Sequence, residues 1–377
     1  MDKVLKINGS VEKGTIALLK SLLENKKING VFTLRKLGRN GSVDYALITD
    51  VSELNNAVPF YPLMPANAGK ILSQFTLKKP IQKPIAAIVK PCELRAFIEL
   101  VKREQGSLEN FLFISSSCGG ILPIKTVEQE DFDKYIADYW NTVKNADTSA
   151  NIRPTCNACE YFTPFNADIT VSLVGEKESD KECKMFLNTD KAEKFIKDFV
   201  QGSAFGMNGE ILEQEFKSSG ISSLLEKRKT EKKKLFDEIH IESMGLDGMI
   251  EVFGKCIGCH GCNRVCPICY CILCDFESAT YDYNKSDFER ELNKKGGLRL
   301  PPDTIFYQIG RLTHMSFSCV GCGLCTDVCP VDIPLSTIFM KIGEETRQIF
   351  DYLPGKDVEE QLPVMIFKED ELTELGE

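Results

Sequence analysis

The sequence predicts an α/β or α+β domain followed by a smaller cysteine-rich domain. Three observations support this fold class. Helical and strand-like segments alternate in the first half, two closely spaced cysteine runs lie in the second half, and a charged stretch separates the halves. The 377 residues also exceed the roughly 250–300 at which single hydrophobic cores stop growing. We expect the α/β domain at residues 1–220, a charged helical linker at 221–250, the cysteine-rich domain at 251–355 and an acidic tail at 356–377.

The alternation begins at the start of the chain. Residues 14–24 carry apolar side chains at helical spacing, which predicts an amphipathic helix. The dipeptide Asn29-Gly30 predicts a turn into a strand over residues 31–34. Residues 45–49 form another strand-like segment, so these elements are consistent with an α/β sheet.

A strand, helix and strand unit then brings two cysteines to one edge of the predicted sheet. Continuous apolar runs at 85–89 and 111–114 are typical of buried parallel strands, and a predicted helix at 93–102 joins them. Cys92 and Cys118 lie just past the ends of these strands. Because neighbouring parallel strands lie about 4.8 Å apart, the two thiols can share one metal centre.

A further pair of cysteines extends this site. Cys156 and Cys159 lie in a predicted loop before the strand-like residues 169–173. Four cysteines from three loops predict a [4Fe–4S] cluster, and the alternative is that they are buried, inert thiols. Cys183 lies in an apolar strand-like run and is expected to serve packing.

The charged stretch and the net charge restrict the function classes. We interpret residues 226–234, which are rich in Lys and Glu, as the solvated face of a helical linker rather than a binding patch. The net charge of −9 argues against nucleic-acid binding. No apolar run approaches the roughly 18 residues of a membrane-spanning helix, and the N-terminus lacks a signal-peptide pattern. A reducing cytoplasm without direct membrane insertion is therefore expected.

The two cysteine runs share one spacing. Cysteines lie three, three and four positions apart and a proline follows the last one, and the runs are Cys256, Cys259, Cys262 and Cys266, then Cys319, Cys322, Cys325 and Cys329. Ferredoxins with two [4Fe–4S] clusters have this spacing, and the fourth cysteine of each run ligates the other cluster. We therefore expect one cluster on Cys256, Cys259, Cys262 and Cys329, and the other on Cys319, Cys322, Cys325 and Cys266. Structural zinc and disulfides suit the pattern less well.

The segment between Cys266 and Cys319 is longer than a minimal ferredoxin needs, so we expect it to fold as an excursion. Arg311, His314 and Met315 lead from it into the second run. We expect His314 to be structural, because each run already supplies four thiolates.

Three cysteines at the start of this excursion are not used by either run. Cys269, Cys271 and Cys274 lie within six residues. They predict either another iron–sulfur or zinc site, completed by a cysteine from elsewhere, or thiols that line and tune the neighbouring cluster.

The first half resembles a known family. The motifs that carry the resemblance are Pro91-Cys92-Glu93, Ser117-Cys118-Gly119-Gly120, Cys156 to Phe162, Ala167-Asp168-Ile169 and Val174-Gly175. Together they are similar to the β subunits of coenzyme F420-dependent hydrogenase and formate dehydrogenase over roughly residues 9–190. The resemblance implies that Cys92, Cys118, Cys156 and Cys159 ligate a [4Fe–4S] cluster beside an FAD. It also implies that the flavin exchanges a hydride with the deazaflavin coenzyme F420.

The flavin site is weakly marked in this sequence. No Gly-x-Gly-x-x-Gly fingerprint is present. Candidate contacts at the N-terminus of the first helix, where backbone N–H groups can bind a pyrophosphate, are Gly9, Ser10, Lys13, Gly14 and Thr15. The alternative is that Gly9 and Ser10 only turn and cap the helix. Asn67 and Lys70 are weaker candidates.

The C-terminal part also carries a resemblance. Residues 318–334 and 350–355 are similar to dicluster segments fused to formate dehydrogenase β subunits and to heterodisulfide-reductase-linked proteins. We therefore expect an iron–sulfur flavoprotein subunit that exchanges a hydride with F420 or NAD(P)H and works with a catalytic α subunit or a heterodisulfide-reductase-like partner. The alternative is an electron-transfer adaptor without a hydride substrate of its own. The acidic residues 359–377 are expected to dock on a partner or to stay solvated.

Overall fold

The computed structural model describes most of the chain. The described residues are 2–38, 41–128, 130–201, 209–214, 216, 219–239, 241–279 and 282–366. Half of the expected acidic tail, residues 367–377, therefore lies outside the described residues. No described helix is both long and apolar enough to cross a membrane.

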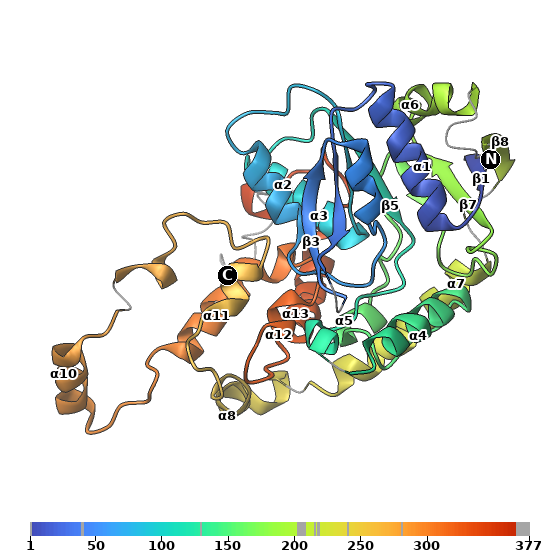
Figure 1. The fold of residues 1–377 in the computed structure, drawn as a ribbon. Helices are drawn as coiled ribbons and strands as arrows, with labels where there is room; N and C mark the ends of the chain where they lie inside the picture. The colour runs from blue at the N-terminus through green and yellow to red at the C-terminus, as the bar shows by residue number, and fades with distance from the viewer. Residues whose placement is uncertain are drawn as a thin grey trace.

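A mixed sheet forms the first half of the molecule (Figure 1). Its strands lie in the order β3-β2-β4-β5-β6-β7-β1-β8. Their bounds are β1 Asp2–Asn8, β2 Val31–Lys36, β3 Val43–Ile48, β4 Ile85–Ile88, β5 Phe111–Ser116, β6 Ile169–Val171, β7 Glu182–Leu187 and β8 Gly209–Gln214. The central strands from β2 to β6 pair in parallel, and the outer pairs are antiparallel. The strands predicted from apolar runs are confirmed, whereas β1 and β8 had no sequence prediction.

The helices cover both faces of this sheet and build the second half. They are α1 Val11–Glu24, α2 Ala68–Thr76, α3 Pro91–Val101, α4 Phe132–Lys144, α5 Pro154–Asn157, α6 Asp190–Gln201, α7 Ser219–Asp237, α8 Ile241–Phe253, α9 Gly261–Val265, α10 Lys285–Lys295, α11 Thr304–Met315, α12 Leu324–Asp327 and α13 Leu335–Phe350. The helices predicted at 14–24 and 93–102 correspond to α1 and α3. Cys156, expected in a loop, lies instead in the short helix α5.

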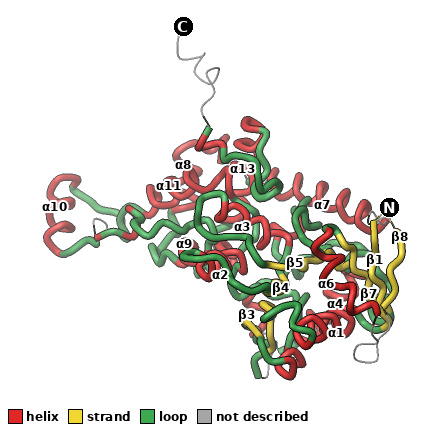
Figure 2. Tube along the Cα trace, turned by 90° about the horizontal axis from the view of Figure 1, so that it is seen from above, coloured by secondary structure: helices red, strands yellow, loops and turns green. Residues whose placement is uncertain are grey.

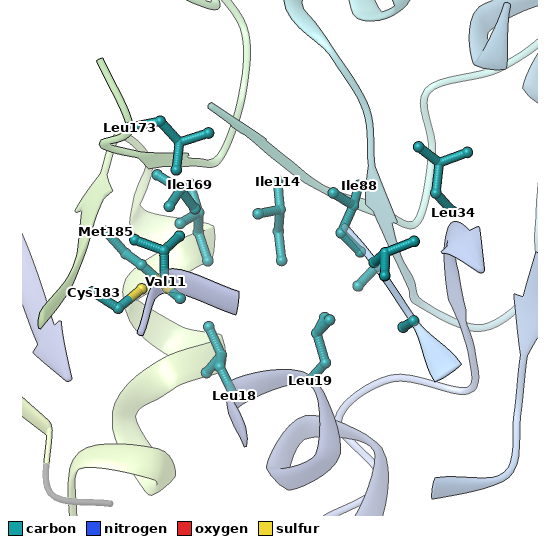
Figure 3. Packing of buried hydrophobic residues seen from close by; sticks show 14 of the residues in the cluster. Val11, Leu18, Leu19, Leu34, Ile88, Ile114, Ile169, Leu173, Cys183 and Met185 are labelled. Carbon is teal, nitrogen blue, oxygen red and sulfur yellow. The ribbon is translucent and has the colours of Figure 1, made fainter. Parts of the chain in front are cut away.

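The contacts of the central strands show on which face of the sheet each helix lies. Ile88 of β4 and Ile114 of β5 pack in the cluster that contains Leu18 and Leu19 of α1, as Figure 3 shows. Their neighbours Ala87 and Phe113 point the other way, into the cluster that contains residues of α2 and α3. Because successive side chains of a strand point to opposite faces, α1 lies on one face and α2 with α3 on the other.

The second half packs a cysteine-rich core from α8 to α13. The long excursion between the cysteine runs is confirmed. It carries α10 away from the body of the molecule, and α10 has no buried residue (Figures 1 and 2). The chain then returns through α11, whose residues Tyr307, Leu312 and Met315 are buried in this core. Only part of the excursion is therefore peripheral.

The charged stretch does form a helix, α7, but the expectation of a solvated face is wrong for Arg228. Its side chain is only 1% exposed. The guanidinium lies 4.6 Å from the ring centre of Phe162 and donates hydrogen bonds to the carbonyls of Cys118 and Gly119. Lys232 of the same helix pairs with Glu160 and Glu344. The helix therefore packs against the cysteine loops, since carbonyl oxygens satisfy the buried cation.

Candidate iron–sulfur centres

The four cysteines predicted at the sheet edge line one cavity. Cys92 lies at the start of α3, Cys118 follows β5, and Cys156 and Cys159 lie in and after α5. β4 and β5 pair in parallel with Ile88 opposite Ile114, so the two strands end at the same edge. The geometry that the sequence predicted for this edge is therefore present.

Buried cations balance the thiols of this cavity. Burial raises the pKa of Cys156 to about 12, and it raises the pKa of Cys92 well above its ordinary value. Metal ligation needs thiolates, so the site requires a compensating positive charge. Arg228 supplies one, because it donates to the Gly119 carbonyl at 3.0 Å and the Cys118 carbonyl at 3.2 Å. Arg153, which is 3% exposed, supplies another.

A second cavity adjoins the first. It is lined by the set that the crossed ferredoxin pattern predicts, Cys266, Cys319, Cys322 and Cys325. Cys322 and the adjacent Gly321 also line the sheet-edge cavity. The two cysteine-lined cavities therefore share a wall, and Cys322 belongs to both.

Three of the four remaining cysteines of the runs are buried in the cysteine-rich core of the second half. Cys256, Cys262 and Cys329 are buried, whereas Cys259 is exposed. The amide nitrogen Nε2 of Gln308 lies 3.5 Å from the sulfur of Cys256 and 3.9 Å from that of Cys262. Helices α9 and α12 contact each other, which brings the first run beside the end of the second. This arrangement agrees with the expected pairing of Cys329 with the first run.

Among the described residues, no three ligand-type side chains already meet at metal-bonding separation. The assignment of four cysteines to each centre therefore stays a prediction. The donor sets fit [4Fe–4S] clusters in their chemistry, because each comprises four thiols in a largely buried, cation-balanced setting.

Cations from the sheet domain hold the ferredoxin loops in place. Arg153 forms an ion pair of 2.6 Å with Asp327 and donates to the Cys322 carbonyl at 2.9 Å. Arg95 donates to the Val320 carbonyl at 2.6 Å. Sequence reasoning missed both arginines, although each lies three residues from a predicted cysteine ligand. The signal that the sequence offered was an arginine three residues from a predicted cysteine ligand.

The flavin candidates at the start of α1 are engaged in local packing and capping. The Ser10 hydroxyl accepts a hydrogen bond from the Lys13 backbone and caps the helix. Gly14 approaches β7 so closely that an added Cβ would lie 2.7 Å from that of Cys183. Thr15 is buried and donates to the Val11 carbonyl, whereas Lys13 is exposed. Gly9 has a positive φ of 124°, as a turn into the helix requires.

The other two flavin candidates lie on α2, on the opposite face of the sheet. The Asn67 side-chain oxygen caps α2 through Gly69, while its buried amide nitrogen has no hydrogen-bond partner among the described residues. Lys70 donates to the carbonyls of Arg264, Cys266 and Cys269, at 2.8, 3.0 and 3.3 Å. The two groups of candidates lie on helices that pack on opposite faces of the sheet, and their contacts to an FAD stay a prediction. Lys70 also joins the two halves of the molecule.

The three additional cysteines share a third cavity with residues of α11. Cys269, Cys271 and Cys274 line it. The Cys269 sulfur lies 3.7 Å from that of Met315, and Cys271 is exposed. His314 lines the same cavity. The thiols are neighbours without forming a ligand set, so both interpretations of these cysteines stay open. Cys183 is fully buried in β7, which confirms its packing role.

Two sequence profiles match this chain. One describes the C terminus of the beta subunit of coenzyme F420 hydrogenase/dehydrogenase, and it matches residues 82–209, which include all four sheet-edge cysteines. The other describes a 4Fe-4S dicluster domain, and it matches residues 252–333, which include both cysteine runs. The second half is therefore a 4Fe-4S dicluster domain.

Two relatives match almost the whole chain. The F420-dependent formate dehydrogenase subunit beta of Methanocaldococcus jannaschii is 28% identical over 90% of this chain and 91% of its own length. The F420-dependent formate dehydrogenase 1 subunit beta of Methanococcus maripaludis is 30% identical over 95% of this chain and 94% of its own length. Among solved structures, a chain of the F420-reducing [NiFe] hydrogenase complex from Methanosarcina barkeri aligns with a TM-score of 0.45 at 13% identity, covering 65% of this chain and 93% of that chain. The near-complete match to the two formate dehydrogenase subunits establishes that this chain is an oxidoreductase subunit of the coenzyme F420 hydrogenase/dehydrogenase beta subunit family.

Proposed function

We propose that this chain is the electron-transferring beta subunit of a formate dehydrogenase or hydrogenase complex that uses coenzyme F420. One observation carries the proposal: Cys322 lines both the sheet-edge cavity and the adjoining ferredoxin cavity. A cluster in each cavity would then lie next to the other across a single cysteine. Such neighbours can exchange single electrons, which is the chemistry that [4Fe–4S] clusters supply.

The proposed ligands follow the predicted sets. Cys92, Cys118, Cys156 and Cys159 hold the cluster at the sheet edge. The adjoining cluster uses Cys266, Cys319, Cys322 and Cys325, and the outer cluster uses Cys256, Cys259, Cys262 and Cys329. Clusters held by these residues would supply one-electron transfer between the sheet edge and the outer cysteines, in either direction.

The protein residues around this route bind and orient its parts. Arg95, Arg153 and Lys70 donate to carbonyls of the loops at the middle cluster, so they hold those loops against the sheet domain. Arg228 holds the loops of Cys118 and Cys159 from the other side. These contacts hold the ferredoxin loops and the sheet domain together beside the wall that the two cavities share.

The hydride part of the proposal rests on the names of the relatives, which are F420-dependent formate dehydrogenase subunits. A bound FAD would supply the conversion between a hydride and single electrons. Because Ser10, Gly14 and Thr15 take part in capping and packing of α1, we assign no residue to FAD. F420 is the proposed hydride carrier, with NAD(P)H as the alternative.

The partner follows from the same comparison. Both relatives are named as beta subunits, so we propose a separate catalytic alpha subunit that carries the formate or hydrogen chemistry. A heterodisulfide-reductase-like protein is the proposed electron acceptor, on the resemblance of residues 318–334 and 350–355. Identifying the proteins that co-purify with this chain tests both.

Anaerobic reduction of the isolated chain, loaded with clusters and FAD, tests the proposed function. We expect reduced F420 to bleach the visible absorption of the clusters faster than NADH or NADPH does. If only NADH or NADPH bleaches the clusters, the nicotinamide replaces F420 as the proposed hydride carrier. No bleaching with any of these donors, while dithionite still reduces the clusters, would reject the hydride function and favour the alternative, an adaptor that joins two redox enzymes.

A further inference from the structure

Helix α11 connects the excursion to the cysteine core. The excursion is longer than a minimal ferredoxin requires, and its α10 is fully peripheral (Figure 1). α11 is different, because Gln308 and Arg311 are polar residues of this helix that are 1% and 3% exposed. Burial of two polar side chains is costly unless they bind specific partners.

The partners of Arg311 are the sulfur and the backbone of Cys262 and the side chain of Gln308. Its Nη1 lies 3.1 Å from the Cys262 sulfur, and its Nη2 donates to the Cys262 carbonyl at 3.3 Å. The guanidinium also lies 5.8 Å from the ring centre of Tyr307 and 5.2 Å from that of Phe339. Within the part of the chain that the structure describes, no carboxylate pairs with Arg311. Its positive charge is therefore directed at the cysteine sulfurs.

Gln308 extends the same contact along the helix. Its Nε2 lies 3.5 Å from the Cys256 sulfur and 3.9 Å from the Cys262 sulfur. Its Oε1 accepts a hydrogen bond from Arg311 at 3.3 Å. One turn of α11 thus directs N–H groups at two sulfurs of the same predicted cluster, and the glutamine orients the arginine.

We propose that α11 sets the reduction potential of the outer cluster, with Arg311 and Gln308 as positioning residues that raise it. The proposal rests on the ligand assignment of the proposed function. Reduction adds one electron to the cluster and no proton, so negative charge increases beside Arg311. A buried cation and N–H groups directed at the sulfurs stabilise this more negative form. The excursion therefore has a redox role in addition to its peripheral arm.

The test compares cluster potentials in matched variants of the full, cluster-loaded chain. The informative changes are Arg311→Met, which removes the charge, Arg311→Lys, which keeps it, and Gln308→Met, which removes the N–H groups at similar size. Arg290→Met on α10 is the control, since it removes the same charge from an exposed side chain. Potentials are measured by anaerobic redox titration followed by electron paramagnetic resonance, after iron analysis of each variant.

We expect Arg311→Met to shift the equilibrium of one cluster at least tenfold toward the oxidised form, which is a 59 mV lower potential for a one-electron couple. Gln308→Met should shift the same signal in the same direction by less, and Arg311→Lys should retain most of the wild-type potential. Arg290→Met should leave all signals in place.

Unchanged potentials in Arg311→Met and Gln308→Met with full iron content would overturn the proposal. An equal shift in Arg311→Lys and Arg311→Met would also overturn it, because charge would then be irrelevant. If Arg311→Met fails to assemble clusters, the other two variants decide. An unchanged potential in Gln308→Met at full iron content, or a tenfold shift in Arg311→Lys, would then overturn the proposal. The titration needs no hydride donor, so its outcome is independent of the test with reduced F420.

Discussion

Removing Arg153 should uncouple the two halves of the molecule. Its guanidinium lies 2.6 Å from the Asp327 carboxylate, and the side chains are only 4% and 6% exposed. Arg153 belongs to the sheet domain and Asp327 lies within the second cysteine run, so this ion pair spans the junction between the two cavities. The replacement Arg153→Met keeps much of the apolar contact and deletes the charge.

The expected loss follows from burial. Breaking a buried ion pair by removing one partner costs about 3–5 kcal/mol, because the other charge is left without compensation. After Arg153→Met, Asp327 still accepts hydrogen bonds from the Ile124 backbone at 3.1 and 3.0 Å. We therefore expect the lower end of this range for Arg153→Met and the upper end for Asp327→Leu. The double variant removes both charges and should be more stable than the sum of the single losses predicts.

Anaerobic urea titration measures these losses with two probes. The fluorescence of Trp140, the single tryptophan, reports on the sheet domain, and visible absorption reports on the clusters. Arg35→Met is the matched control, since Arg35 pairs with Asp44 at 2.9 Å with both side chains about one third exposed, and this pair should contribute much less. A loss for Arg153→Met no greater than that of Arg35→Met would refute the reasoning from burial.

Three further predictions concern Gly14, Cys183 and Cys156. Gly14→Ala should lower the free energy of unfolding by about 1–3 kcal/mol through overpacking against β7, and it should leave the flavin content unchanged. Gly297→Ala is the control and should leave stability unchanged, because an added Cβ there meets open space. Loss of flavin at full stability would instead support a flavin role for Gly14. Burial raises the pKa of Cys183 from 9.0 to about 12, so its contribution to stability is complete below pH 9 and is lost as the pH rises toward 12. Native-state alkylation at pH 8.5 should accordingly spare Cys183 and modify the exposed Cys271. Cys156→Ser should lower the iron content from about twelve to about eight per chain and leave the ferredoxin clusters visible by electron paramagnetic resonance; loss of all iron would indicate global misfolding instead.

The sequence was informative wherever the chemistry depends on close spacing along the chain. The two cysteine runs specify their pattern within about ten residues each, because three of the four ligands to each predicted ferredoxin cluster come from one tight loop. Apolar runs at β4 and β5 were equally clear, since a strand buried on both faces carries no polar positions. The parallel pairing of these strands then placed Cys92 and Cys118 at one edge, as the right-handed crossover predicts.

The flavin candidates show where such local reasoning stopped. Residues 9–15 and α2 are both helix starts with glycine and lysine, which by sequence alone suit a pyrophosphate equally well. The two helices pack on opposite faces of the sheet, because α1 contacts the face of Ile88 and Ile114 whereas α2 contacts the other. A helix N-terminus is a property of a few residues, but which face of the sheet it lies on depends on the whole chain.

By itself the sequence determined the cysteine patterns, the family resemblance and the central strands of the sheet. Only the tertiary structure decided how the cysteine-lined cavities adjoin and which cations attend them. Arg153 reaches Asp327, Arg228 reaches the Cys118 loop, and Lys70 reaches the carbonyl of Cys266. Each of these contacts joins residues more than a hundred positions apart. A buried arginine or lysine carries no periodic signature, so its partners emerge only when folding brings distant carbonyls and carboxylates within hydrogen-bonding distance.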